Sequence, residues 1–187
     1  MIDQKVESGL LNRFRILIGI IMLISFNRTV CYAGNHHETG FWICGGAGPV
    51  ILDRKAGFGG IAGIHYNSAW GLFGIRYAVS EISGMEPSET TPPKIESLTE
   101  YSATWGLIRK WKRIRLSASG GLAFVRSDYR IPGGKKEELN IGIPLDLEIS
   151  LRILPVYCVG LAYAPVFTSD VNTHRMLLVL HFGKVWN

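Results

Sequence analysis

The chain has 187 residues, of which 47% are hydrophobic and 19% are charged, below the roughly 25% charged residues of typical soluble domains. Its length suits one domain and is short for two. Glycine occurs 22 times, and long helix-periodic segments are missing, so the composition favours an all-β chain over a helical one. The formal net charge of +5 is modest, and we expect no nucleic acid among the partners.

The N-terminus has the pattern of an export signal. A basic stretch ending at Arg15 precedes the apolar run Ile16–Phe26, and Ala33 supplies a small residue for cleavage. The run is too short for a transmembrane helix, which needs about 20 residues. A buried N-terminal helix remains the alternative. We therefore predict a signal peptide over residues 1–33 and an outer-membrane β-barrel domain over residues 34–187.

Eight runs of alternating character follow, each about as long as a tilted transmembrane strand, which takes about 9–11 residues. Turns after the second, fourth and sixth runs are short, whereas the connections 83–96 and 126–138 are long and polar. Short turns at one end and long loops at the other are typical of an eight-stranded antiparallel up-and-down transmembrane β-barrel. The predicted strands are Thr39–Ile51, Gly57–Asn67, Trp70–Ile82, Ser97–Ile108, Ile114–Val125, Leu139–Arg152, Val156–Val166 and His174–Trp186.

The strands have two unlike faces. Over Leu139–Arg152 every odd-numbered residue is Leu or Ile and every even-numbered residue is polar, Gly or Pro. Other runs place bulky apolar residues on one face and Gly, Ala and Ser on the other. Small residues suit the narrow interior of an eight-stranded barrel, whereas a sheet face exposed to water would carry many charged and polar residues. We therefore expect the bulky face to meet lipid.

Charges at mid-strand positions fall on the small face, with three of each sign. Buried charges are costly unless paired, so equal numbers indicate an ion-pair network inside the barrel; charges on a solvated sheet face are the alternative. Asp146 and Glu148 are expected to pair with Arg76 and Arg115, and Pro144, which lacks an N–H, to lie at a bulge. The predicted lumen network comprises Arg76, Glu100, Arg115, Asp146, Glu148 and Arg152.

Aromatic residues gather by strand end. Trp and Tyr favour the membrane–water interface, so we predict a girdle at the short-turn end. The predicted girdle comprises Trp42, Tyr66, Trp70, Trp111, Tyr157 and Trp186.

Cys44 and Cys158 lie far apart within predicted strands and are expected to be small buried residues rather than a disulfide.

With this strand count, alternation and ending, residues 34–187 resemble the small eight-stranded bacterial outer-membrane proteins of the OmpX and OmpA transmembrane-domain type. The C-terminal "MLLVLHFGKVWN" looks like the last strand that the family presents to the barrel-assembly machinery, although Asn187 follows the aromatic Trp186. The resemblance implies a bacterial outer-membrane location, contact with outer-membrane lipid, and a structural or surface-interaction role through extracellular loops.

Three other functions remain open. Lipid A deacylases of this size resemble one another in a His-x-Ser-Asn motif, but "IHYNSA" has these residues in another order, so we expect no enzyme. A narrow pore is disfavoured because side chains fill eight-stranded barrels. "TGFW" resembles the lipocalin Gly-x-Trp, but a lipocalin would then have a poorly solubilising outer face. "NHHE" at 35–38 lacks metal-ligand spacing. We expect no catalytic, cofactor-binding or metal-binding residues.

Overall fold

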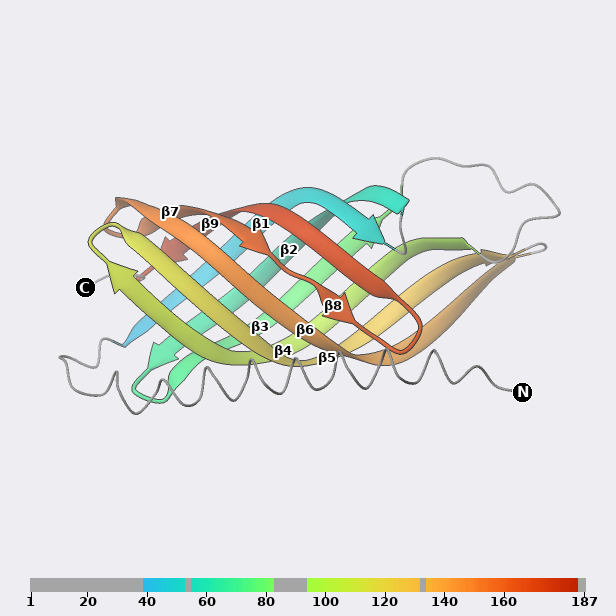
Figure 1. Cartoon of the computed structure of the whole chain (residues 1–187), viewed down its shortest axis with the longest axis horizontal. Helices are drawn as coiled ribbons and strands as arrows, with labels where there is room; N and C mark the ends of the chain where they lie inside the picture. Colours follow the sequence, from blue (N-terminus) through green and yellow to red (C-terminus); the bar gives the residue numbers. More distant parts are fainter. Residues whose placement is uncertain (1–38, 53–54, 83–93, 132–133, 185–187) are drawn as a thin grey trace, which may run out of the picture. The chain divides into compact units, whose positions relative to one another are not determined.

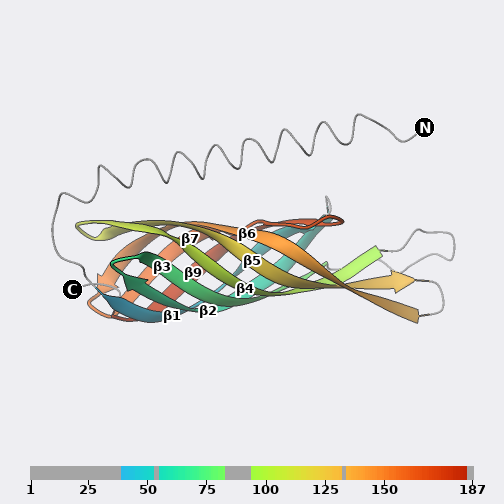
Figure 2. The same ribbon diagram turned by 90° about the horizontal axis from the view of Figure 1, so that it is seen from below.

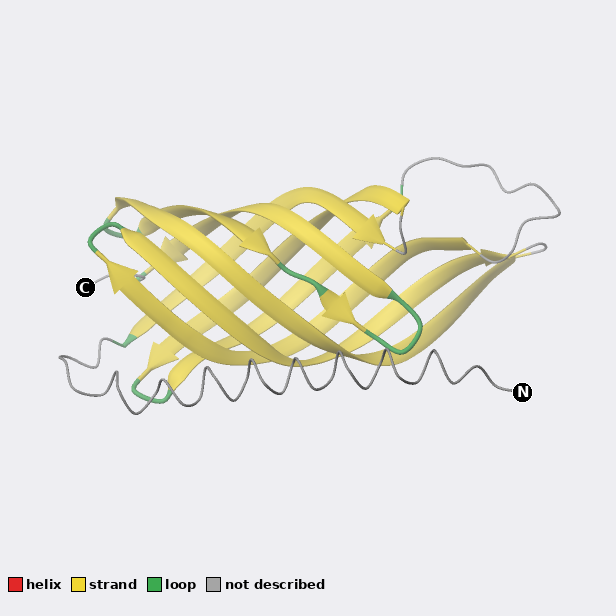
Figure 3. Cartoon of the chain, in the orientation of Figure 1, coloured by secondary structure: helices red, strands yellow, loops and turns green. Residues whose placement is uncertain are grey.

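The computed structural model describes residues 39–52, 55–82, 94–131 and 134–184. In these ranges every regular element is a strand (Figures 1 and 3). No helix among them is long and apolar enough to cross a membrane. The strands are β1 (Gly40–Leu52), β2 (Lys55–Ser68), β3 (Gly71–Glu81), β4 (Lys94–Trp111), β5 (Ile114–Ile131), β6 (Gly134–Leu154), β7 (Tyr157–Tyr163), β8 (Val166–Phe167) and β9 (Asn172–Gly183).

The strands close into an antiparallel ring. Each strand from β1 to β6 pairs with the next along the chain, and β9 pairs with both β7 and β1. β7 and β8 continue one another, because Tyr163 faces Met176 and Val166 faces Thr173 of β9 without a change of register. Only Ala164 and Pro165 separate them. The ring therefore has eight strands, as the sequence predicted.

The two ends of the ring differ. At one end, here called the short-turn end, the turns 69–70, 112–113 and 155–156 connect the strands. The opposite end is called the loop end. There β4, β5 and β6 extend past their neighbours, as Figure 2 shows. We call their outermost parts, residues 94–98, 126–131 and 134–139, the projecting sheet.

The projecting sheet corrects the prediction of a long loop at 126–138. Arg126–Ile131 instead pairs residue by residue with Gly134–Leu139, so only two residues separate β5 from β6. Its polar side chains compensate one another across the strands: Glu96 contacts Arg130 at 3.0 Å and Lys135 at 3.3 Å. Cross-strand pairs of opposite charge stabilise a sheet, so a polar segment can form one.

Pro144 lies at a gap in the ladder rather than at the predicted bulge. Gly120 faces Leu145 and Ala123 faces Gly142, which leaves the register of β5 and β6 unchanged across the proline. On its other side Pro144 faces Val166, and the next N–H, that of Leu145, donates to the carbonyl of Pro165 at 3.0 Å. The missing N–H of Pro144 therefore removes one hydrogen bond from the ladder, but no extra residue is inserted and no bulge forms.

The interior has two regions. Toward the loop end it is filled by apolar side chains, which we call the apolar plug. Toward the middle and the short-turn end it holds charged and aromatic groups. The alternation of bulky and small residues along each strand predicts which side chains point inward. It does not predict that the inward side chains near the loop end are apolar. The apolar plug consists of Val50, Leu52, Ile95, Leu98, Ala123, Val125, Val166 and Val171.

Candidate functional site: the barrel interior and its outward face

The outward face is apolar around the whole ring. Leu139 and Ile141 of β6 are 72% and 69% exposed, and every strand of the ring carries similar residues. So large an exposed apolar surface is unusual for a soluble monomer and marks contact with protein or membrane. Further examples are Ile43, Phe58, Ile75, Tyr101, Leu122, Phe124, Leu147, Leu161, Met176 and Phe182.

Glu100 is the centre of the first buried ion-pair group. Its carboxylate, fully buried, accepts hydrogen bonds from Arg76 at 2.5 Å and from Arg175 at 2.6 Å. Arg76 also donates to Asp146, and Arg175 donates to the Ser80 hydroxyl at 2.8 Å. Two guanidinium groups and two carboxylates therefore compensate one another across β3, β4, β6 and β9.

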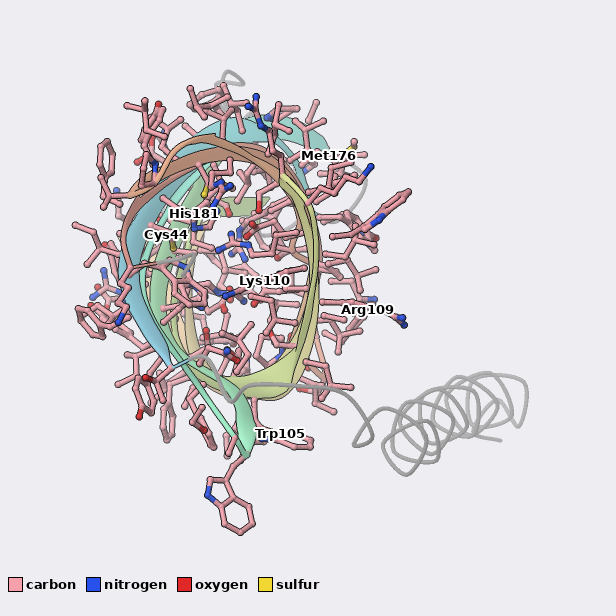
Figure 4. The ribbon with its side chains drawn as sticks, turned by 90° about the vertical axis from the view of Figure 1, so that its left-hand side faces the viewer. Cys44, Trp105, Arg109, Lys110, Met176 and His181 are labelled. Atoms are coloured by element: carbon pink, nitrogen blue, oxygen red, sulfur yellow. The ribbon has the colours of Figure 1, made fainter. Side chains whose placement is uncertain are left out.

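A second group lies nearer the short-turn end. Arg115 donates to Glu148 and, through Nε, to the Ser150 hydroxyl at 2.8 Å. The same Glu148 oxygen lies 2.9 Å from Nε2 of His181. Figure 4 looks into the barrel from this end and shows His181 and Cys44 inside the ring, with Trp105 and Met176 outside.

The structure brings five of the six residues of the predicted lumen network into these two groups. Asp146 contacts Arg76 and Glu148 contacts Arg115, the partners assigned from the sequence. Arg152 lies on the same face of β6 as Glu148, and its place in a network stays a prediction.

Two further residues of these groups, Arg175 and His181, were not predicted from the sequence. Both could have been found from the alternation, since Met176, Leu178 and Leu180 point outward and the odd-numbered residues of β9 must then point inward.

Trp42 corrects the predicted aromatic girdle. Its side chain is 2% exposed and lies inside the barrel, where it stacks on His65 with ring centroids 5.5 Å apart. The even-numbered residues of β1 point inward. Phe41, Trp42 and Ile43 are all apolar, so the alternation could not show which of them faces outward.

The other girdle positions are compatible with an interface. Tyr66, Trp70 and Trp111 are exposed at the short-turn end, and Tyr157 packs against Phe182 with ring centroids 4.8 Å apart. The Nε1–H of Trp105 donates to the carbonyl of Trp70 at 3.1 Å, which adds a residue that the prediction did not include. Trp186 lies outside the described residues.

Around Trp42 lies a set of side chains that we call the donor cluster: Trp42, His65, Arg115 and His181. The Arg115 guanidinium carbon is 5.0 Å from the centre of the Trp42 ring. The His65 and His181 rings are 6.5 Å apart. In each member one buried nitrogen has no hydrogen-bond partner: Nε1 of Trp42, Nδ1 of His65, Nη1 of Arg115 and Nδ1 of His181.

Cys44 and Cys158 are free and buried, as expected from their spacing. Sγ of Cys44 lies 3.2 Å from Nε2 of His65. Within the described ranges no group of three or more His, Cys, Asp or Glu side chains is arranged to hold a metal ion. The segment "NHHE" at 35–38, which is not expected to bind metal, lies outside those ranges.

His65 and Ser68 of "IHYNSA", the residues compared with the deacylase motif, do not contact each other. His65 points inward to Cys44, whereas the Ser68 hydroxyl belongs to the β2–β3 turn, where it donates to the Gly71 carbonyl at 3.4 Å and accepts from the Trp70 N–H at 3.1 Å. A serine nucleophile needs a base within hydrogen-bond reach, and His65 does not act as one for Ser68 here.

Gly121, on the inward face of β5, lets the backbone of β4 approach closely, which gives a matched pair of substitutions with the outward Gly45. A Cβ at Gly121 would collide with the Ala103 carbonyl oxygen and lie 2.8 Å from Cα of Thr104. We expect Gly121→Ala to lower the free energy of unfolding by about 1–3 kcal/mol. At the outward Gly45 the nearest atom would be 3.9 Å away, so Gly45→Ala should change it by less than about 0.5 kcal/mol. Urea unfolding in micelles measures both, and equal effects would contradict this packing.

No family model matches the sequence, and no curated protein sequence matches it. Solved structures do match. Neisserial surface protein A (NspA) is similar with a TM-score of 0.65 and 12% identity, covering 78% of this chain and 98% of that one. Ail, the attachment invasion locus protein of Yersinia pestis, has a TM-score of 0.55, 15% identity and coverages of 80% and 99%. A major outer membrane protein of Thermus thermophilus has a TM-score of 0.57, 9% identity and coverages of 79% and 100%.

These similarities extend over nearly the whole of each matched structure and rest on a shared arrangement of strands, since the identities are low. They agree with the ring of strands. The chain therefore has the fold of the small eight-stranded bacterial outer-membrane β-barrels.

Proposed function

We propose that this protein spans the bacterial outer membrane as a β-barrel and acts there as a structural or surface-interaction protein. The observation that carries the proposal is the outward face: bulky apolar side chains are exposed around the ring while the charged ones are paired inside. In water this arrangement would expose the apolar surface, whereas in a bilayer lipid covers it. Outer-membrane lipid is thus a partner, and the barrel-assembly machinery would insert the chain.

Membrane insertion is tested by fractionation and gel mobility. The protein is expected in the outer-membrane fraction, and unboiled samples should run faster on a denaturing gel than boiled ones, because the closed hydrogen-bonded ring stays compact in detergent. A soluble monomer whose mobility does not change on boiling would contradict the proposal.

The projecting sheet is the part of the barrel best placed to meet a surface ligand. Its exposed Lys135 and Lys136 are paired with Glu96 and Glu138. The surface is therefore of mixed charge rather than uniformly basic. One solved structure of Ail contains the heparin analogue sucrose octasulfate, a ligand of that protein. For this chain we propose a surface ligand that recognises mixed charge at the loop end.

The orientation has its own test. Cys44 and Cys158 are buried, and Cys31 belongs to the predicted signal peptide, so in the mature chain a cysteine introduced at the surface is the reactive one. We expect a membrane-impermeant maleimide to label Lys135→Cys on intact cells, because the loop end faces outward. Arg113→Cys, in the β4–β5 turn, should be labelled only after the cells are broken. The reverse pattern would place the projecting sheet in the periplasm.

The interior does not favour a pore or an enzyme. The apolar plug fills the loop-end region, and the buried ion pairs occupy the middle. We propose that the barrel neither conducts ions nor catalyses a reaction. In planar bilayers it should give no single-channel steps, and steady unitary currents would make the pore the better hypothesis. Unchanged lipid A masses in expressing cells are expected as well.

A further inference from the structure

One arginine at the short-turn end lies on the outward face, at the border of its apolar surface. Arg109 of β4 faces Leu116 of β5, which is 51% exposed, whereas the preceding residue, Ile108, packs inside the ring against Trp42 and its neighbours. Figure 4 shows Arg109 outside the ring and Lys110 inside it. A guanidinium on a lipid-facing surface must either reach water or pair with an anion.

Within the described ranges the protein supplies no anion for Arg109. Every carboxylate there lies either inside the ring or toward the loop end. Those inside are Glu100, Asp146 and Glu148, and those toward the loop end are Glu81, Glu96, Asp128, Glu137, Glu138 and Asp170. Arg126 differs in this respect: it is exposed on the outward face of β5 at the loop end, and its Nε lies 3.5 Å from Asp128.

Two tryptophans place Arg109 at the level of lipid headgroups. Trp105 and Trp111 share its face of β4, four residues before it and two after it, and Trp111 is 70% exposed. Tryptophan side chains in membrane proteins gather at the membrane–water interface. The guanidinium between them therefore lies near the lipid phosphates, and its planar fork of N–H donors can bind a phosphate through two hydrogen bonds.

The surroundings of Arg109 favour a lipid with a net negative charge. Arg113 of the β4–β5 turn and Lys184, just after β9, are exposed at the same end, which has no carboxylate in the described ranges. Basic side chains at a membrane surface attract anionic lipids, whereas a zwitterionic headgroup brings an ammonium group that these cations repel.

We propose that Arg109 binds the phosphate of an anionic phospholipid, with Trp105 and Trp111 on either side of the headgroup. The proposal rests on the proposed function, because it requires the outward face to lie in a bilayer. It adds the class of lipid and the residue that selects it. In the orientation proposed above, this lipid belongs to the periplasmic leaflet.

The test follows the indole N–H resonances of the ¹⁵N-labelled barrel in phosphatidylcholine nanodiscs that contain an increasing share of phosphatidylglycerol. Both lipids carry a phosphate, but only phosphatidylglycerol has a net negative charge. The Trp111 resonance should shift with saturation as the share of phosphatidylglycerol rises. Trp42, whose side chain lies inside the ring, is the control in the same spectrum and should not shift.

Variants show whether Arg109 selects the lipid. Native mass spectrometry measures the ratio of phosphatidylglycerol to phosphatidylcholine retained by the barrel from an equal mixture. Arg109→Gln should lower this ratio by about fivefold, the effect of one basic residue at an anionic surface. Arg109→Lys should restore part of it, since the charge returns without the fork. Arg126→Gln is the matched control and should leave the ratio unchanged, because Asp128 already pairs with Arg126.

The outcomes separate this inference from the proposed function. If gel mobility shows a folded barrel in the nanodisc but Trp111 does not shift with saturation, the inference is wrong and the membrane barrel stands. The inference is also wrong if Arg109→Gln and Arg126→Gln lower the lipid ratio equally, since any exposed arginine would then attract the lipid. A protein that remains a soluble monomer would overturn both proposals.

Discussion

Replacing Glu100 with Gln should lower the free energy of unfolding by about 3–5 kcal/mol, the largest effect expected of any single change in this barrel. The amide has nearly the same shape as the carboxylate but no charge. Arg76 and Arg175 would then be buried with only Asp146 between them, and a buried charge without compensation is strongly destabilising. Because packing is almost unchanged, the loss of unfolding free energy measures the contribution of the ion pairs.

The measurement is urea unfolding of the refolded barrel in lipid vesicles, followed by tryptophan fluorescence and gel mobility. Glu96→Gln is the matched control, because Glu96 also contacts two cations, Arg130 and Lys135, but in the exposed projecting sheet. There the loss should be below about 1 kcal/mol.

A second variant separates charge from packing. Adding Arg175→Met to Glu100→Gln removes one of the two uncompensated guanidiniums and should recover part of the lost stability. A loss below about 1 kcal/mol for Glu100→Gln, or no recovery in the double variant, would mean that the interior is hydrated enough to screen these charges.

The sequence predicted the fold because the constraint repeats in every strand. A residue in a barrel strand faces either lipid or the narrow interior, so over Leu139–Arg152 β6 alternates between Leu or Ile and polar or small residues. In β5 the outward positions likewise include Ile114, Leu116 and Leu122. The ion pairs of Asp146 and Glu148 follow from the same period once the inward face is known. The alternation can be recognised within a single strand, and each of the eight strands shows it independently.

The features that the sequence did not predict depend on neighbours far along the chain. Trp42 stands between two apolar residues, so its inward direction is fixed by the pairing of β1 with β2 and β9. The segment 126–138 is polar and contains Pro132, and its strands form because Glu96 of β4 supplies cross-strand partners. The donor cluster likewise combines β1, β2, β5 and β9, which no single stretch of sequence reveals.

Placing Arg at Leu147 tests the orientation of the whole barrel. Leu147 is 53% exposed on the outward face of β6, between residues 145 and 149 of the same face. If that face lies in the bilayer near its midplane, Leu147→Arg should cost about 2–4 kcal/mol, because the guanidinium loses water and finds no partner in lipid. In a barrel whose outer face met water, an exposed Leu could be replaced by Arg at almost no cost.

Ile153→Arg is the control for that experiment, since it changes the same strand and face at a similar exposure but lies beside the turn 155–156. Near a membrane interface the cost of Arg falls to about 0–1 kcal/mol. Unfolding in vesicles should therefore show a loss at residue 147 that exceeds the loss at residue 153 by more than about 1 kcal/mol. If the barrel were soluble and its outer face met water, the two variants would lose equally little unfolding free energy. Only the bilayer distinguishes positions on one face by their depth, so the difference between the two variants, rather than either value alone, decides whether lipid covers this face.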